Sequence, residues 1–254
     1  MTRNLMPRAT CAALLAITLA LAGNARADAK KMVLTRPLKA GTVANYKATI
    51  KANIMGTDAV IEQTRKQTIK EIKDNGNVVI LSEDLGGTMK LGDQEQKQPA
   101  GPPATETRDK LGKLIEITQE QPENSPFTPE IQKLIAALGD LILTDKEVAD
   151  GDTWETMLDN PASKDNKVKV KSTYQGIDKV EGVDLWKFKQ ISEAVVNADG
   201  TKMIVELAIW INPKDGLVEK VDGKTKDVPT QFGPIEFTLN LQRTKAEGSA
   251  GNKL

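Results

Sequence analysis

The stretch Ala44-Asn45-Tyr46-Lys47-Ala48-Thr49-Ile50-Lys51-Ala52-Asn53-Ile54 decides the fold class of this chain. Apolar or aromatic residues alternate with polar residues along its whole length. A period of two is typical of a β-strand with one buried face and one face in water. The stretch therefore predicts a sheet that packs against the protein core on one side only.

Similar segments follow this stretch along the chain. Residues 59–72 and 78–85 are strand-like, and Asn75-Gly76 between them predicts a type I′ hairpin turn, in which both central residues have positive φ. Further strands are predicted at 88–98, 105–108, 114–118, 167–177, 183–191, 195–196, 203–211, 217–221 and 235–242. The turn signals between strands are Gly86-Gly87, Gly92-Asp93, Asp199-Gly200, Asp215-Gly216 and Asp222-Gly223.

One helix is predicted between the two groups of strands. Thr128 is the expected N-cap, Pro129 stands at the first helical position, and Gly139 follows as the C-terminal cap. The apolar residues between these caps recur with helical spacing and are Ile131, Leu134, Ile135 and Leu138. This single apolar stripe predicts a short helix near 129–138 that lies across a concave sheet face and closes it.

Glycine turn motifs recur at nearly constant spacing along the chain. Gly41, Gly76 and Gly112 in the first part match Gly151, Gly182 and Gly216 in the second, with offsets of 110, 106 and 104 residues. The order is kept, which predicts an internal duplication. Hairpins also share turn chemistry whatever their origin, so chance similarity between turns is the alternative explanation.

These patterns together predict a mainly β fold. We expect two similar curved antiparallel sheets, a half-barrel-like tandem repeat, with one short connecting helix. The predicted units are a first β half-unit at 28–120, a linker with the helix at 121–144, a second β half-unit at 145–244 and a disordered tail at 245–254.

The first 27 residues indicate export. Arg3 and Arg8 precede an apolar run at 12–22, and Ala25-Arg26-Ala27 has the form of a signal-peptide cleavage site. We therefore expect a periplasmic or extracellular protein with no transmembrane segment after cleavage, because the run is shorter than the roughly 20 residues that span a bilayer. Cys11 is the one cysteine of the chain and precedes the run, so the mature chain lacks both a lipid-anchor cysteine and disulfides.

The composition argues against most kinds of chemistry. The chain has no histidine, and its 35 basic residues balance its 35 acidic residues, so neither His-based sites nor binding to nucleic acid is favoured. Nucleotide-binding glycine motifs are absent, and the acidic residues around Asp150-Gly151-Asp152 fit a turn better than a calcium loop. The sequence therefore predicts neither an enzyme nor a metal or cofactor site.

Three tryptophans are the largest side chains of the chain. Trp186 and Phe188 share one face of a predicted strand, and Trp210 lies in the following one. Large aromatic residues usually fill cores. The functional interpretation is that Trp186, Phe188 and Trp210 line a concave sheet face that holds an apolar ligand.

Short motifs between Pro37 and Thr244 carry a family resemblance. They are Lys39-Ala40-Gly41 before the first strand, Gly151-Asp152-Thr153-Trp154, and Asp215-Gly216-Leu217-Val218 near the end. In these the chain resembles a family of uncharacterised bacterial secreted β-rich proteins, described as a domain of unknown function. Their curved antiparallel sheets are similar to the half-barrels of periplasmic lipoprotein-carrier and lipid-binding proteins. The resemblance implies a fold and carries over no catalytic residue.

The leading functional hypothesis is an exported, non-catalytic binding protein of the cell envelope, with an apolar or lipid-like ligand on a concave sheet face. The first alternative is a structural or protein–protein interaction module with an envelope protein partner, because polar strands such as 59–72 offer edges for pairing. The second alternative is a hydrolase that uses carboxylates alone. It would require two carboxyl groups that converge in a cleft and have raised pKa values.

Overall fold

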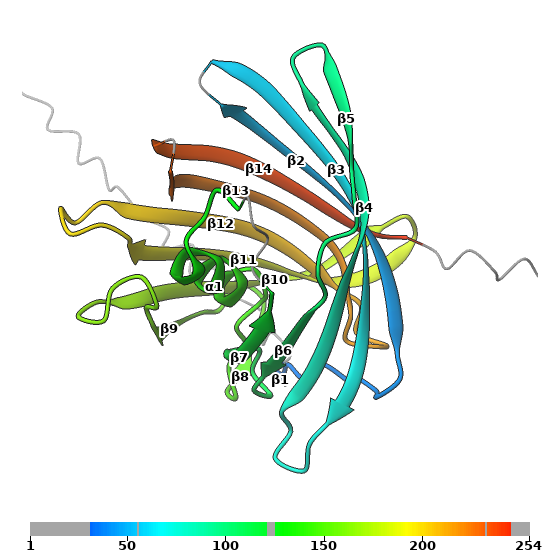
Figure 1. Cartoon of the computed structure of the whole chain (residues 1–254). Coiled ribbons are helices and arrows are strands. Elements are labelled where there is room, and N and C mark those ends of the chain that lie inside the picture. Colours follow the sequence, from blue (N-terminus) through cyan, green and yellow to red (C-terminus); the bar gives the residue numbers. More distant parts are fainter. Residues whose placement is uncertain (1–30, 55, 121–124, 232, 245–254) are drawn as a thin grey trace, which may run out of the picture.

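A computed structural model describes residues 31–54, 56–120, 125–231 and 233–244 (Figure 1). The predicted signal peptide at 1–27 and the predicted tail at 245–254 lie outside the described residues. The one helix is α1 (Pro129–Leu138). The strands are β1 (Met32–Val33), β2 (Val43–Ile54), β3 (Thr57–Ile72), β4 (Val78–Leu91), β5 (Gln94–Gln98), β6 (Ala104–Arg108), β7 (Leu114–Gln119), β8 (Glu147–Val148), β9 (Thr153–Asp159), β10 (Lys167–Val180), β11 (Val183–Val195), β12 (Lys202–Ile211), β13 (Val218–Thr230) and β14 (Gly233–Thr244).

Twelve of these strands form one sheet, which is strongly curved and twisted (Figure 1). The strand order is β7-β6-β4-β3-β2-β14-β13-β12-β11-β10-β9, with β5 beside β4, and β1 and β8 form a separate two-stranded sheet. Every strand pair of the sheet is antiparallel. The predicted fold class, mainly β with curved antiparallel sheets and one short helix, is therefore confirmed. The two expected sheets are the two ends of a single sheet, which β14 and β2 join.

The matched glycine pairs lie at corresponding turns of this sheet. Gly76 and Gly182 lie in the β3–β4 and β10–β11 turns, and Gly112 and Gly216 lie in the β6–β7 and β12–β13 turns. All four have positive φ, which glycine adopts without a steric penalty. The duplication and the unit boundaries stay predictions, because a simple meander also places such turns between its strands.

Two of the predicted turns lie inside strands instead. The Gly86-Gly87 pair is part of β4, and Gly223 is part of β13. A Cβ on Gly87 would lie 1.8 Å from the carbonyl oxygen of Glu62 in the neighbouring strand, so only glycine permits this approach. A Cβ on Gly223 would lie 2.9 Å from Leu207 Cδ2. Gly87 and Gly223 allow close packing within the sheet, and the turns predicted at Gly86-Gly87 and Asp222-Gly223 are therefore wrong.

The predicted β3–β4 hairpin is confirmed, but the predicted turn type is wrong. Gly76 has a φ of 82°, whereas Asn75 does not have positive φ, which a type I′ turn would require. The amide of Gly76 donates to the carbonyl of Lys73, and the amide of Lys73 donates to the carbonyl of Asn77. The loop therefore has three residues, a turn followed by a left-handed glycine, which is the next most common hairpin connection.

Helix α1 has the predicted bounds and covers one face of the sheet. The Thr128 hydroxyl accepts a hydrogen bond from the Ile131 amide at 3.4 Å and caps the helix as predicted. Gly139 stands at the C-cap with a φ of −77°, so this position does not need the left-handed freedom of glycine. Among the described residues, no helix is long and apolar enough to cross a membrane.

Candidate functional site

Helix α1 and the residues after it close the sheet face formed by β9–β13. We call residues 129–143 the plug. Leu134, Leu138, Leu141 and Ile142 are fully buried in the main core cluster. The side chains of the plug therefore occupy this part of the face themselves.

Buried polar side chains fix the plug to the sheet. Gln190, which is fully buried, accepts a hydrogen bond from the Ile142 amide at 2.9 Å and donates to the Asp140 carbonyl at 3.0 Å. The Ile142 carbonyl accepts from Ser172 Oγ at 3.2 Å and from Trp154 Nε1 at 3.0 Å. Side chains from β9, β10 and β11 thus form hydrogen bonds with backbone groups of Asp140 and Ile142, which do not belong to any strand.

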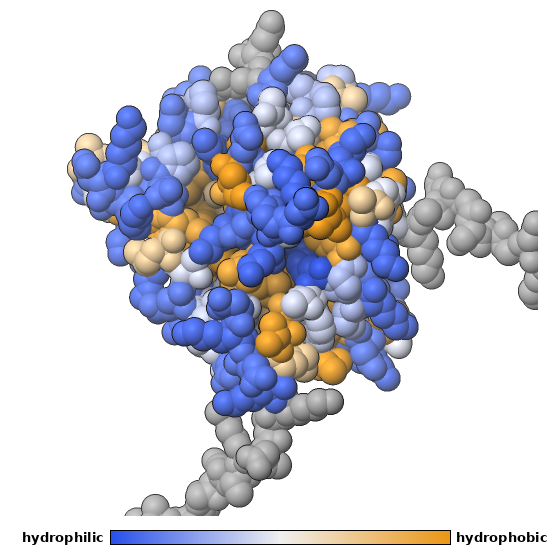
Figure 2. All heavy atoms as spheres, turned by 90° about the horizontal axis from the view of Figure 1, so that it is seen from below, coloured by the Kyte–Doolittle hydropathy of each residue, from blue (hydrophilic) through white to orange (hydrophobic). Residues whose placement is uncertain are grey.

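Beside the plug, a cavity of about 440 Å³ opens at the end of the sheet where the β3–β4 and β6–β7 turns lie. We call it the end cavity. Seven apolar side chains line it: Val33, Leu34, Leu38, Ile72, Val78, Ile80 and Leu111. Val33 is 49% exposed and Ile72 is 39% exposed, so the apolar wall continues to the surface. Seen from this end, apolar residues reach the surface in patches between hydrophilic ones (Figure 2).

Arg108 forms part of the polar side of the end cavity and is only 5% exposed. Its Nε and Nη2 atoms lie 2.8 and 2.7 Å from the carboxylate of Glu106. Its Nη1 donates to the Gly112 carbonyl at 2.9 Å, and its Nη2 donates to the Ala136 carbonyl at 2.7 Å. Arg108 thereby connects the β6–β7 turn to the plug.

Asp140 and Arg36 complete this polar side. Arg36 Nη1 lies 3.1 and 3.0 Å from the two carboxylate oxygens of Asp140, and Arg36 Nε donates to the Gly216 carbonyl at 2.8 Å. Burial alone would raise the pKa of Asp140. The nearby charges of Arg36 and Arg108, together with the Leu141 amide, outweigh burial and lower that pKa. The carboxylate is therefore ionised, and its charge is balanced by its partners. A general acid would instead need a raised pKa.

Reasoning from the sequence did not single out Arg36, Arg108 or Asp140. One signal was available, since only seven of the 35 basic residues are arginines and only four of these lie in the described part. Three of those four, Arg36, Arg108 and Arg243, form ion pairs with low exposure. Arginine suits such sites because its planar guanidinium group can donate hydrogen bonds to several acceptors at once.

The predicted ligand-contacting residues do not all lie together, because Trp210 lies apart from Trp186 and Phe188. Phe188 is fully buried, with its ring centroid 5.3 Å from that of Tyr174, and Trp186 is half-buried against the same core cluster. Trp210 pairs in register with Lys187, which places it on the opposite face of the sheet. There its indole donates to Asp178 at 2.9 Å, and the ammonium groups of Lys187 and Lys220 lie over its ring. A ligand role for Trp186, Phe188 or Trp210 stays a prediction.

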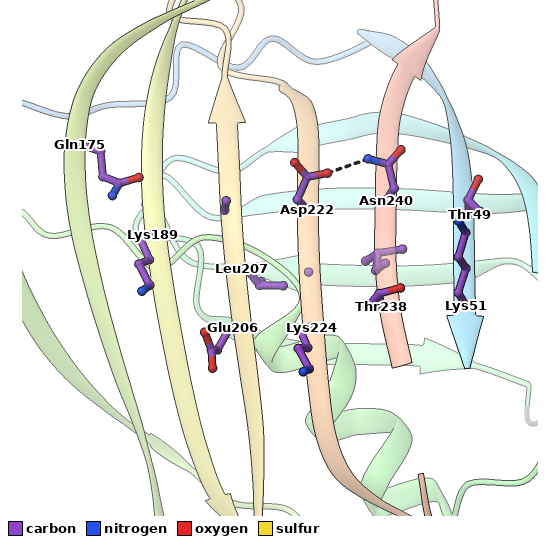
Figure 3. Close-up of a pocket in the computed structure, with 13 residues that line it drawn as sticks. Thr49, Lys51, Gln175, Lys189, Glu206, Leu207, Asp222, Lys224, Thr238 and Asn240 are labelled. Carbon is purple, nitrogen blue, oxygen red and sulfur yellow. Dashed lines mark hydrogen bonds between the residues drawn. The ribbon is translucent and has the colours of Figure 1, made fainter. Parts of the chain in front are cut away.

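A second depression, of about 500 Å³, lies on the sheet face that points away from the plug (Figure 3). Leu207 belongs to the core cluster, so its neighbours Glu206 and Ala208 point to the other face. The lining comes from β2 and β10–β14, and α1 is visible behind the strands in Figure 3. We call this the outer depression.

Comparisons with known proteins give no family. No family model matches the chain, and no curated protein matches it. The hypothetical lipoprotein YmcC from Escherichia coli (K12) is 12% identical, with a TM-score of 0.26 over 84% of this chain and 91% of that one. A domain from Vibrio parahaemolyticus, described as an outer membrane lipoprotein-sorting protein, is 9% identical, with a TM-score of 0.22 over 82% and 86% of the two chains. Overlays at these scores support no inference about this protein.

Proposed function

We propose that this protein is an exported, non-catalytic binding protein of the cell envelope that holds an apolar or lipid-like ligand in the end cavity. The observation that carries the proposal is the cavity itself, with about 440 Å³ of space behind a wall of seven apolar side chains. Its volume falls in the range of about 300–1,000 Å³ that is usual for small-molecule sites. The predicted signal peptide at 1–27 supports the proposed envelope location.

The charges around the cavity narrow the ligand chemistry. Both guanidinium groups on its polar side have carboxylate partners, Asp140 for Arg36 and Glu106 for Arg108. A ligand that carries a strong negative charge would have to displace one of these buried pairs, which is costly. The three basic lining residues are balanced by three acidic ones, so the site favours an apolar body with an uncharged or zwitterionic head group over a fatty acid anion. These charged residues are Arg36, Arg108, Lys110, Asp109, Asp140 and Asp145.

Binding of the neutral apolar dye N-phenyl-1-naphthylamine tests the proposal. Ile72→Trp places a larger side chain at the mouth of the end cavity, and Ile177→Trp makes the same change at an exposed site that does not line it. We expect the wild type and Ile177→Trp to bind the dye equally. Ile72→Trp should bind about tenfold more weakly, which corresponds to about 1.4 kcal/mol.

Two outcomes would contradict the proposal. The first is that the folded wild type does not bind the dye at all. The second is that Ile72→Trp and Ile177→Trp change dye binding by the same factor, because the end cavity would then not be the site. Either result would favour the interaction module. The edge predicted at 59–72 is wrong, because β3 pairs with β2 on one side and β4 on the other, so the edge strands β5, β7 and β9 would be the surfaces to test by cross-linking.

A further inference from the structure

The outer depression combines unpaired positive charges with hydrogen-bonding side chains. Lys51, Lys189 and Lys224 line it, and we call them the lysine trio. We propose that the outer depression binds an acidic polysaccharide chain, whose anionic groups contact the lysine trio. This site lies on the opposite face of the sheet from the plug and is independent of the end cavity.

The charge pattern is the first argument. Among the described residues, no ion pair involves any member of the lysine trio, whereas Lys47, Lys187 and Lys220 on the same face are all paired. Of the two acidic residues that line the depression, Asp222 is already bound by Lys220 at 2.7 Å and by Asn240 at 2.6 Å. Three ammonium groups without an ion pair in the described part of the chain therefore share the depression with one such carboxylate, Glu206, which pairs in register with Lys224, and the remaining positive charge favours an anion.

The spacing of the charges is the second argument. Lys51 and Lys224 both pair in register with Thr238, so they flank β14 at the same level. Two strand spacings separate them, about 10 Å between backbones. Lys189 begins the adjacent row, in which Ala208, Asp222 and Asn240 follow across the sheet. The positive charges are thus spread along a path across the strands, which suits a chain with repeated negative groups better than one compact anion.

The neutral residues are the third argument. Thr49, Thr238, Asn240 and Gln175 offer hydroxyl and amide groups along this path, and the short side chain of Ala208 leaves room at its floor. Such groups match the hydroxyls of a sugar chain. None of the lining residues is aromatic, so the depression offers no ring on which nucleic-acid bases could stack. Leu207 and Leu239 belong to the core face of their strands, so the depression also offers no large apolar side chain that could insert into a lipid layer.

The test is the affinity for an oligogalacturonate, a defined acidic sugar chain, with a neutral malto-oligosaccharide of equal length as the control ligand. The variant is Lys51→Gln/Lys189→Gln/Lys224→Gln. The matched control is Lys47→Gln/Lys169→Gln/Lys202→Gln, which removes the same charge from the same face at lysines that already have carboxylate partners. Circular dichroism and binding of N-phenyl-1-naphthylamine verify that both variants keep the fold and the end cavity.

We expect the wild type to bind the acidic chain and not the neutral one, more weakly as salt rises. The trio variant should lose about tenfold in affinity, and the control variant less than about twofold. Equal losses in both variants, or no binding by the wild type, would overturn the proposal. Binding to anionic phospholipid vesicles but not to oligogalacturonate would also overturn it, in favour of a membrane surface.

Discussion

Asp140 stabilises the polar side of the end cavity, because it holds Arg36 directly and lies 3.8 Å from Arg108. Its pKa is lower in the folded protein than in the unfolded chain. Its contribution to stability is therefore complete above the unfolded pKa and is lost as the pH falls through the folded pKa. We predict that Asp140→Asn lowers the free energy of unfolding at neutral pH by about 3 kcal/mol, because it leaves a buried guanidinium without its charge partner.

Urea unfolding measured as a function of pH tests this prediction. The difference between wild type and Asp140→Asn should be constant near neutral pH and should shrink on acidification below the unfolded pKa. Asp159→Asn is the matched control, since Asp159 also has a lowered pKa, through Lys167, but is fully exposed. A difference that does not depend on pH would show that Asp140 acts through shape and not through charge.

Gly87 shows how one residue controls an element. It lies within β4, and no side chain fits between it and the Glu62 carbonyl. We predict that Gly87→Ala lowers the free energy of unfolding by about 3 kcal/mol or more, because the two backbones must separate. Gly101→Ala is the control, since its Cβ would meet only the flexible Asp84 side chain at 3.2 Å and should change stability by less than about 0.5 kcal/mol. Equal effects in thermal unfolding would contradict the explanation.

The plug depends on Gln190 in a similar way. We predict that Gln190→Met destabilises the protein by about 2–4 kcal/mol, because the Ile142 amide and the Asp140 carbonyl both lose their partner inside the core. Hydrogen exchange should show faster exchange at the Ile142 amide. Ser192→Ala is the control on the same strand, because its buried hydroxyl has no partner among the described residues. That variant should be neutral or more stable, and unchanged protection of Ile142 in Gln190→Met would contradict our account of the plug.

At the scale of elements, most of the correctly predicted strands and the helix rest on local patterns in the sequence. The alternation at 44–54 and the capped helix at 129–138 are both found in the structure, because each depends on residues close together in the chain. The failures have a common cause. Gly87 and Gly223 are required by atoms of neighbouring strands, Glu62 and Leu207, which lie 25 and 16 positions away in sequence. A turn signal cannot be distinguished from a close approach without knowing the partner strand.

At the scale of the whole molecule, the candidate site is formed by segments that meet only in the folded chain. The end cavity combines residues 33–38, the β3–β4 turn, the β6–β7 turn and residues 140–145. Its central ion pair, Arg36 with Asp140, joins residues 104 positions apart. A contact between residues so far apart leaves no periodic pattern in the sequence. The sequence therefore predicted a concave apolar face but not which segments would form it. The ligand face that the aromatic residues predict at β11 and β12 stays a prediction, and the end cavity lies elsewhere, between residues 33–38, the ends of β3 and β4, and the β6–β7 turn.

The central claim is that the end cavity holds an apolar or lipid-like molecule. Native mass spectrometry of residues 28–254, purified without detergent, tests it most directly. We predict an added mass of lipid size that organic extraction removes and that is reduced in Ile72→Trp but not in Ile177→Trp. A bare protein mass from folded wild type that also fails to take up N-phenyl-1-naphthylamine would contradict the account.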